Sequence, residues 1–84
     1  MKHAYIECTQ SAFKHGIKEK DIYHAMLHPV YDEIQDSGDD KHLLLGFDCG
    51  LNLLEIAYHI IDEQKFKVFH AMRCRYIYYE LIRS

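Results

Sequence analysis

The chain is organised around residues 53–73, which read LLEIAYHII (53–61), DEQK (62–65) and FKVFHAMR (66–73). Two apolar runs rich in β-branched and aromatic residues flank a short polar break, which is typical of an antiparallel hairpin. Side chains alternate between the two faces of a strand. When the more apolar sets of both strands are placed together, the other face collects Glu55, His59, Lys65, Lys67 and Arg73. This polar face is the best candidate for a functional surface, and it requires Lys67 and Arg73 to point the same way.

Patterns on either side of the hairpin predict the remaining elements. Gly16 suits the left-handed residue that ends a helix, and Pro29 stops one. The expected elements are helices over residues 12–15, 18–28 and 75–82 and strands over 30–35, 42–47, 53–61 and 66–73, with a turn at 36–40. Residues 1–8 predict no element. The expected fold class is α+β: two N-terminal helices, a four-stranded antiparallel meander sheet and a C-terminal helix, with one sheet face open to a ligand.

Length and composition indicate a small soluble protein. A chain of 84 residues is expected to form one domain, residues 1–84, with a small core that is compatible with a homo- or hetero-oligomer. There is no apolar run near the ~20 residues of a membrane helix and no signal-peptide pattern, so we expect a cytoplasmic protein that does not contact a membrane. The three cysteines form no pair motif, which favours a reducing compartment. A net charge of −3 lacks the basic balance typical of nucleic-acid binders.

The polar face nevertheless carries groups that can cut RNA without a metal ion. Attack of a 2′-hydroxyl on the adjacent phosphate needs a proton acceptor, a proton donor for the leaving oxygen, and cations that stabilise the transition state. His59, Lys67 and Arg73 are the candidates for these catalytic roles. The candidate contacts to RNA or phosphate on and after the same strand are Lys65, Arg75 and Tyr76. The alternative is that alternating lysines form the solvated side of a strand, and that the tyrosines pack the last helix.

Lys14 and His15 form a second candidate site. A histidine at a helix C-terminus is stabilised as imidazolium by the helix dipole, which suits a general acid or a phosphate contact. The alternative is an exposed histidine at a helix end.

His24 and His28 lie four residues apart on the polar side of the second expected helix, a spacing found in zinc sites. No H-E-x-x-H motif and no cysteine pair completes such a site. We therefore expect no metal and no cofactor, and we interpret these histidines as a solvated face.

Several short motifs resemble those of BrnT-type toxins. The motifs are FKHGI (13–17), a helix start before Pro29, LLG (44–46), LLxxxY (53–58) and KFKVFHAMR (65–73). They occur in the same order as in those toxins and span roughly residues 12 to 80. The resemblance implies a RelE-like fold and a bacterial toxin of a type II toxin–antitoxin pair. It implies a ribonuclease that inhibits translation and is held inactive by a cognate antitoxin, which often also binds DNA. His15, Lys67 and Arg73 fall on matching positions, and Lys14 matches in residue type.

Three functions are compatible with these patterns. The leading hypothesis is a metal-independent endoribonuclease toxin with RNA as its substrate. The first alternative is a non-catalytic interaction module of the same fold that binds a partner helix through the apolar, tyrosine-rich C-terminal segment. The second is a small metal-binding domain that uses His24 and His28.

Overall fold

The hairpin that the sequence predicts forms the middle of the sheet. The structure is a computed structural model, and it describes residues 5–35 and 40–83. In it β4 spans Leu53–Asp62 and β5 spans Lys65–Arg73. The two strands pair antiparallel across the polar break, with Ile56 opposite Ala71 and His59 opposite Lys67.

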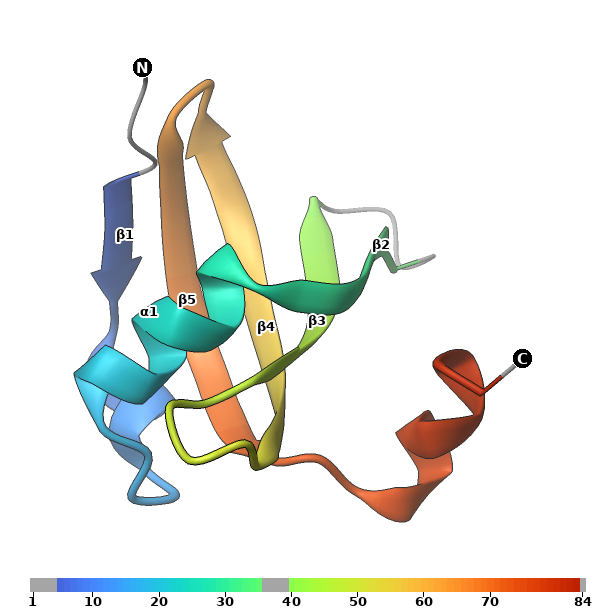
Figure 1. Cartoon of the computed structure of the whole chain (residues 1–84). Coiled ribbons are helices and arrows are strands. Elements are labelled where there is room, and N and C mark those ends of the chain that lie inside the picture. Colours follow the sequence, from blue (N-terminus) through green and yellow to red (C-terminus); the bar gives the residue numbers. More distant parts are fainter. Residues whose placement is uncertain (1–4, 36–39, 84) are drawn as a thin grey trace.

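The other strands add to both sides of this hairpin (Figure 1). β3, Lys41–Phe47, pairs antiparallel with β4, and β2, Pro29–Ile34, pairs antiparallel with β3 at one edge. At the other edge, β1, Tyr5–Cys8, runs parallel to β5. The result is a five-stranded mixed sheet with the order β1-β5-β4-β3-β2. The turn expected at 36–40 lies, apart from Asp40, outside the described residues.

The expected fold class is therefore wrong. The described residues form a mostly β structure with one parallel pairing and one short α-helix, not two N-terminal helices, a four-stranded antiparallel meander and a C-terminal helix. The strand missed from the sequence, β1, has four residues and is held by residues far along the chain, through bonds such as Thr9 N to Val68 O at 2.9 Å. No local pattern can show such a pairing, because strand formation depends on the neighbouring strands.

Two of the expected helices are 3₁₀ segments, which we label η1, Gln10–Phe13, and η2, Tyr76–Leu81. Both have i→i+3 bonds, such as Tyr78 N to Arg75 O at 3.0 Å, and neither has a side-chain N-cap bond. Short segments without a cap do not nucleate an α-helix readily. None of the described helices is long and apolar enough to cross a bilayer.

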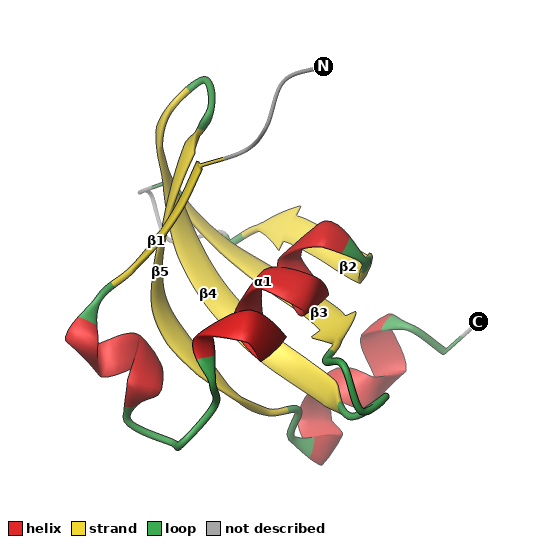
Figure 2. Cartoon of the chain, turned by 60° about the vertical axis from the view of Figure 1, so that its left-hand side comes forward, coloured by secondary structure: helices red, strands yellow, loops and turns green. Residues whose placement is uncertain are grey.

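α1, the α-helix of the described residues, spans Glu19–Leu27 and covers one face of the sheet (Figure 2). It begins and ends within one residue of the predicted span, 18–28, and Ile22 and Ala25 are fully buried. Gly46 on β3 permits this packing, because a Cβ at that position would meet the backbone carbonyl of Ala25. The core beneath α1 consists of Ile6, Ala12, Ile22, Ala25, Leu44, Leu54, Ile56, Tyr58, Val68 and Ala71. The opposite face of the sheet, which we call the open face, holds the candidate site.

Candidate functional site

An extra residue in β5 decides which side chains reach the open face. Ala57 pairs with His70 and Tyr58 pairs with Val68, so Phe69 has no partner on β4. This β-bulge interrupts the alternation of side chains along the strand. Phe69 and His70 consequently line the same cavity, although they are consecutive in the sequence.

The bulge separates two residues that the sequence places together. Lys67 pairs with His59 on the open face, whereas Arg73 pairs with Leu54, a core residue on the α1 side. The predicted grouping of Lys67 with Arg73 on one face is therefore wrong, because one extra residue shifts the alternation beyond it. His70, predicted on the apolar side, lies on the open face instead. The polar face is thus a different set of residues from the one that the alternation predicts.

A cavity of about 410 Å³ lies over the open face, between η1, the sheet and the segment after β5. Its wall contains three imidazoles, three cationic side chains and two other aromatic rings, contributed by His15, His42, His70, Lys14, Lys41, Arg75, Phe69 and Tyr78. The structure therefore brings together three of the predicted residues, Lys14, His15 and Arg75, and adds others to them.

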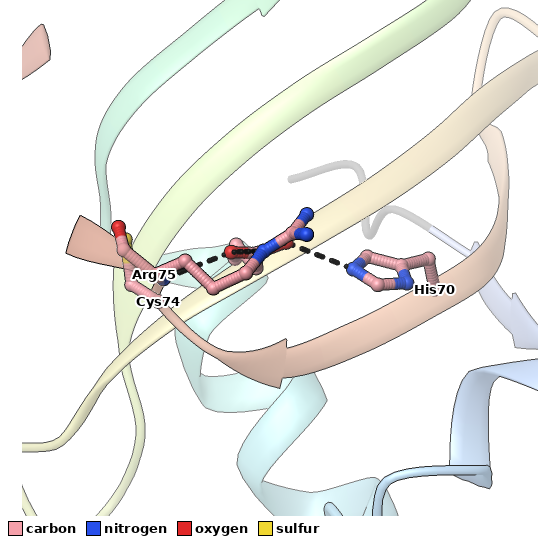
Figure 3. A network of polar contacts seen from close by, with 4 residues as sticks. His70, Cys74 and Arg75 are labelled. Atoms are coloured by element: carbon pink, nitrogen blue, oxygen red, sulfur yellow. Dashed lines mark hydrogen bonds and ion pairs between the residues drawn. The ribbon is translucent and has the colours of Figure 1, made fainter. Parts of the chain in front are cut away.

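Glu55 is the polar centre of this cavity wall. Its register partners on β3 and β5 are the apolar residues Leu45 and Met72, and the residue is only 1% exposed. Arg75 donates to the carboxylate from Nη2 at 2.7 Å, from Nε at 3.1 and 3.2 Å, and from its backbone N at 2.9 Å. Nε2 of His70 lies 3.0 Å from Oε2. Figure 3 shows His70 and Arg75 approaching this carboxylate from different directions.

The bonds at Glu55 fix its ionisation state. Burial alone would raise the pKa of the carboxyl, but the hydrogen bonds from Arg75 and His70 and the charge of Arg75 hold the pKa below its ordinary value. The same contact raises the pKa of Arg75. Glu55 is therefore an acceptor only, which requires the proton of the neutral His70 ring to be on Nε2. Nδ1 of His70 is left as the atom that can take up a proton.

His15 comes from the turn after η1 and meets His70 in the cavity. The two rings are in edge-to-face contact, with centroids 5.6 Å apart. The left-handed conformation of Gly16, with φ at 82°, turns the chain directly after His15. The guanidinium of Arg75 lies 5.5 Å from the ring centre of Tyr78, which also lines the cavity. The imidazoles of His15 and His70, which can transfer protons, and the guanidinium of Arg75, which is bonded to Glu55, therefore line the same cavity.

The remaining predicted residues lie elsewhere. His59 and Lys67 are on the open face but outside the cavity lining, with the His59 ring stacked on Phe69. Lys65 is ion-paired with Glu7 at 3.3 Å and lies over the ring of Tyr5.

Arg73 lies near Asp48. Burial alone would raise the pKa of the Asp48 carboxyl, but hydrogen bonds from Asn52 and Gly50 and the charge of Arg73 hold this pKa below its ordinary value. Tyr76 is 84% exposed and contacts Tyr79.

The alternation places Glu55 on the polar face, but the sequence also contains a signal that this residue is buried. Glu55 is a single carboxylate within the apolar run LLEIAY, and a charge at a buried strand position requires partners. That signal identifies Glu55 as a residue held by cations but does not identify the cations. His70 and Lys41 carry no such signal, because their place depends on the bulge and on the pairing of β3.

The described residues contain no group of three or more side chains suited to hold a metal ion. Nδ1 of His24 is bonded to the backbone oxygen of Phe47 at 2.7 Å, and the ring stacks on His28 with centroids 4.5 Å apart. These contacts account for the histidine pair as part of the packing of α1 on the sheet.

Comparison of the chain with models of protein families, with curated proteins and with solved structures found no match. The resemblance to BrnT-type toxins therefore rests on the short motifs alone. The chemistry of the cavity provides the independent support for a function.

Proposed function

We propose that this protein is a metal-independent endoribonuclease whose active site is the cavity on the open face. The observation that carries the proposal is the contact of His15 with His70, with ring centroids 5.6 Å apart, in a cavity that also contains Lys14, Lys41 and Arg75. Two imidazoles serve as proton acceptor and proton donor near neutral pH, and cations stabilise a pentacoordinate phosphate. The position of both rings at one cavity supports a reaction that needs both transfers.

His70 acts as the base in this proposal. Nδ1 of neutral His70 takes the proton of the ribose 2′-hydroxyl while that oxygen attacks the adjacent phosphorus. Glu55, bonded to Nε2, orients the ring and stabilises the imidazolium that forms, as a carboxylate does in a catalytic triad. Glu55 is thus a positioning residue, because its carboxylate is buried and its oxygens are bonded to Arg75 and His70.

His15 acts as the acid. Protonated His15 gives its proton to the 5′-oxygen as the bond from that oxygen to phosphorus breaks. The products are a 2′,3′-cyclic phosphate and a free 5′-hydroxyl, so no net proton is consumed. Lys14 directly precedes His15 and lines the same cavity, which places an ammonium group beside the donor.

Arg75 and Lys41 bind the phosphate. Arg75 is anchored to Glu55 through Nε and Nη2, and Nη1 has no hydrogen bond to any other described residue. A guanidinium held in this way presents a donor to a phosphate oxygen at little entropic cost. Its side chain is 53% exposed, so an RNA phosphate can reach it.

The motif resemblance suggests the biological role. We propose that the protein is the toxin of a type II toxin–antitoxin pair, that it cuts RNA in the cytoplasm and inhibits translation, and that a cognate antitoxin inhibits it. FKHGI (13–17), one of the shared motifs, contains Lys14 and His15 of the cavity. The motif and the proposed chemistry thus concern the same residues.

The test is RNA cleavage by purified protein in EDTA. We expect wild-type protein to cut single-stranded RNA to cyclic-phosphate ends, with His15→Gln and His70→Gln slower by about 10²–10⁴-fold. Glutamine at position 70 can still donate to Glu55. His28→Gln is the matched control, because His28 is exposed at the end of α1, away from the cavity. Intact RNA with the wild type, or equal rates in all four proteins, would reject the nuclease.

A second function, binding of a partner helix without catalysis, is favoured by the surface of η2. None of its residues is buried, and Tyr76 and Ile77 are 84% and 70% exposed. Tyr79, together with Leu51 and Leu53, lines a second cavity of about 410 Å³ on this side. Exposed apolar patches of this kind mark interaction sites.

The two functions give different results in one experiment. The protein is co-expressed with the product of the adjacent reading frame, and the wild type is compared with Ile77→Asp. Ile61→Asp is the control, because Ile61 is exposed at the far end of β4. Co-purification lost only in Ile77→Asp, with RNA left intact by the free wild type, would favour the interaction module over the nuclease.

A further inference from the structure

Phe69 is an aromatic side chain placed on the polar, open face of the sheet. Its ring stacks on the ring of His59, with centroids 4.7 Å apart and an angle of 25° between the planes. Phe69 also lines the cavity that contains His70 and Arg75. We call these two rings the aromatic shelf. Phe69 is outside the core under α1, so packing of that core does not account for its position.

The bulge that exposes Phe69 is held by a polar contact. Oγ of Ser11 donates to the carbonyl oxygen of Phe69 at 2.8 Å, and it also bonds Oγ1 of Thr9 at 2.8 Å. Ser11 belongs to η1, the segment that leads to Lys14 and His15. The same contact therefore fixes the aromatic shelf relative to the proposed acid. β-Bulges occur frequently beside active sites, where they redirect a side chain.

We propose that the aromatic shelf is a nucleobase-binding subsite, in which the base of a nucleotide beside the cleaved phosphate stacks on Phe69 with His59 behind it. This inference rests on the proposed ribonuclease function and specifies its substrate as single-stranded RNA. A base can stack on a protein ring only when it is free of its own neighbours, as in loops and single strands.

The charges beside the shelf suit the backbone of such a strand. Lys41 and Lys67 are the register partners of His59 on β3 and β5, so two ammonium side chains start on either side of the shelf. Glu7, the register partner of Lys67 on β1, is ion-paired with Lys65 at 3.3 Å. The shelf therefore combines a stacking surface with cations, which is the composition of single-strand binding sites.

The chain contains no tryptophan, so Phe69→Trp introduces a single indole reporter. The ligands are a 2′-O-methyl RNA 6-mer, which cannot be cleaved by 2′-hydroxyl attack, the same sequence as a duplex, and inorganic pyrophosphate. We expect saturable quenching of the indole by the single strand and none by the duplex or pyrophosphate.

Phe69→Leu keeps an apolar side chain without a ring. We expect it to weaken binding of the labelled single strand by about 5- to 150-fold, without changing pyrophosphate binding. His59→Ala removes the second ring and is expected to weaken binding in the same direction.

The outcomes separate this inference from the nuclease. If the indole is quenched and binding depends on the ring, but the wild type does not cleave natural RNA, the nucleobase-binding subsite is supported and the nuclease proposal is rejected. Cleavage by the wild type, with no quenching and with unchanged affinity in Phe69→Leu, would overturn the shelf alone. Equal binding of single strand and duplex would also overturn it, as would failure of the wild type to bind the single strand. Circular dichroism of each variant establishes that a loss of binding is not a loss of fold.

Discussion

Nη2 of Arg75 lies 2.7 Å from Oε2 of Glu55, and this carboxylate is 1% exposed while the arginine side chain is 53% exposed. The acid is thus held in an apolar strand position by partners that reach it from the solvent side. A buried charge that is stabilised in this way contributes to folding as well as to the site, and the two contributions can be measured separately.

The first prediction concerns the stability that this pairing provides. Glu55→Gln keeps the shape of the side chain and removes its charge, so the bonds from Arg75 and His70 weaken. We expect the free energy of unfolding to fall by about 1–3 kcal/mol, the usual range for hydrogen bonds to charged groups. Urea unfolding followed by circular dichroism measures it. Glu63→Gln, at an exposed position of the β4–β5 turn, serves as the control and is expected to unfold like the wild type.

The second prediction concerns pH. The folded-state pKa of Glu55 lies below its ordinary value of 4.5, because the bonds from Arg75 and His70 outweigh the effect of burial. A group with a lowered folded-state pKa stabilises the fold fully above its unfolded pKa and ceases to do so as the pH falls through the folded value. We expect the unfolding free energy of the wild type to drop below about pH 4.5. The drop in Glu55→Gln should be smaller, and parallel curves for the two proteins would contradict the prediction.

The third prediction separates two arginines that are two residues apart. Arg75 lines the cavity of the open face, whereas Arg73 pairs with Leu54 on the α1 side. If the cavity is the active site, Arg75→Ala lowers the cleavage rate by about 10²–10³-fold, the range for removal of one donor to the transition state. Arg73→Ala leaves the rate at the wild-type level. Rates are measured with excess protein over RNA after thermal melts establish that both variants are folded. If Arg73→Ala lowered the cleavage rate and Arg75→Ala did not, the active site would lie outside this cavity.

The fourth prediction concerns the packing of α1. A Cβ added at Gly46 would meet the backbone of Ala25, and backbone cannot move aside without displacing the helix. We expect Gly46→Ala to lower the free energy of unfolding by about 1–3 kcal/mol, as overpacking does. Gly50→Ala is the matched control, because the nearest atom to a Cβ there is Nδ2 of the Asn52 side chain at 3.4 Å. Equal stability of the two variants would show that α1 lies farther from β3 than the structure places it.

Local patterns predict a good part of this structure. The position of α1 follows from the spacing of Ile22 and Ala25 and from Pro29, and the central hairpin follows from its two apolar runs. The left-handed conformation of Gly16 also follows from the residue type. These features depend on residues that are close in the sequence, which is why the sequence contains their signals.

The fold class and the make-up of the site were not predictable in this way. β1 depends on hydrogen bonds to β5, about 60 residues along the chain, and a four-residue strand has no pattern of its own. The sequence also gives no sign of the bulge at Phe69, because nothing in FKVFHAMR marks the residue at which the alternation is interrupted. One inserted residue exchanges the faces of every later side chain on the strand.

The sequence by itself determined the helix, the hairpin and the presence of His15, Glu55 and Arg75 as groups able to support acid–base and phosphate chemistry. The tertiary structure alone decided that His70 joins them and that Arg73 does not. The physical reason is that the face on which a strand residue lies depends on its hydrogen-bond register with another strand, and register is a property of the pair.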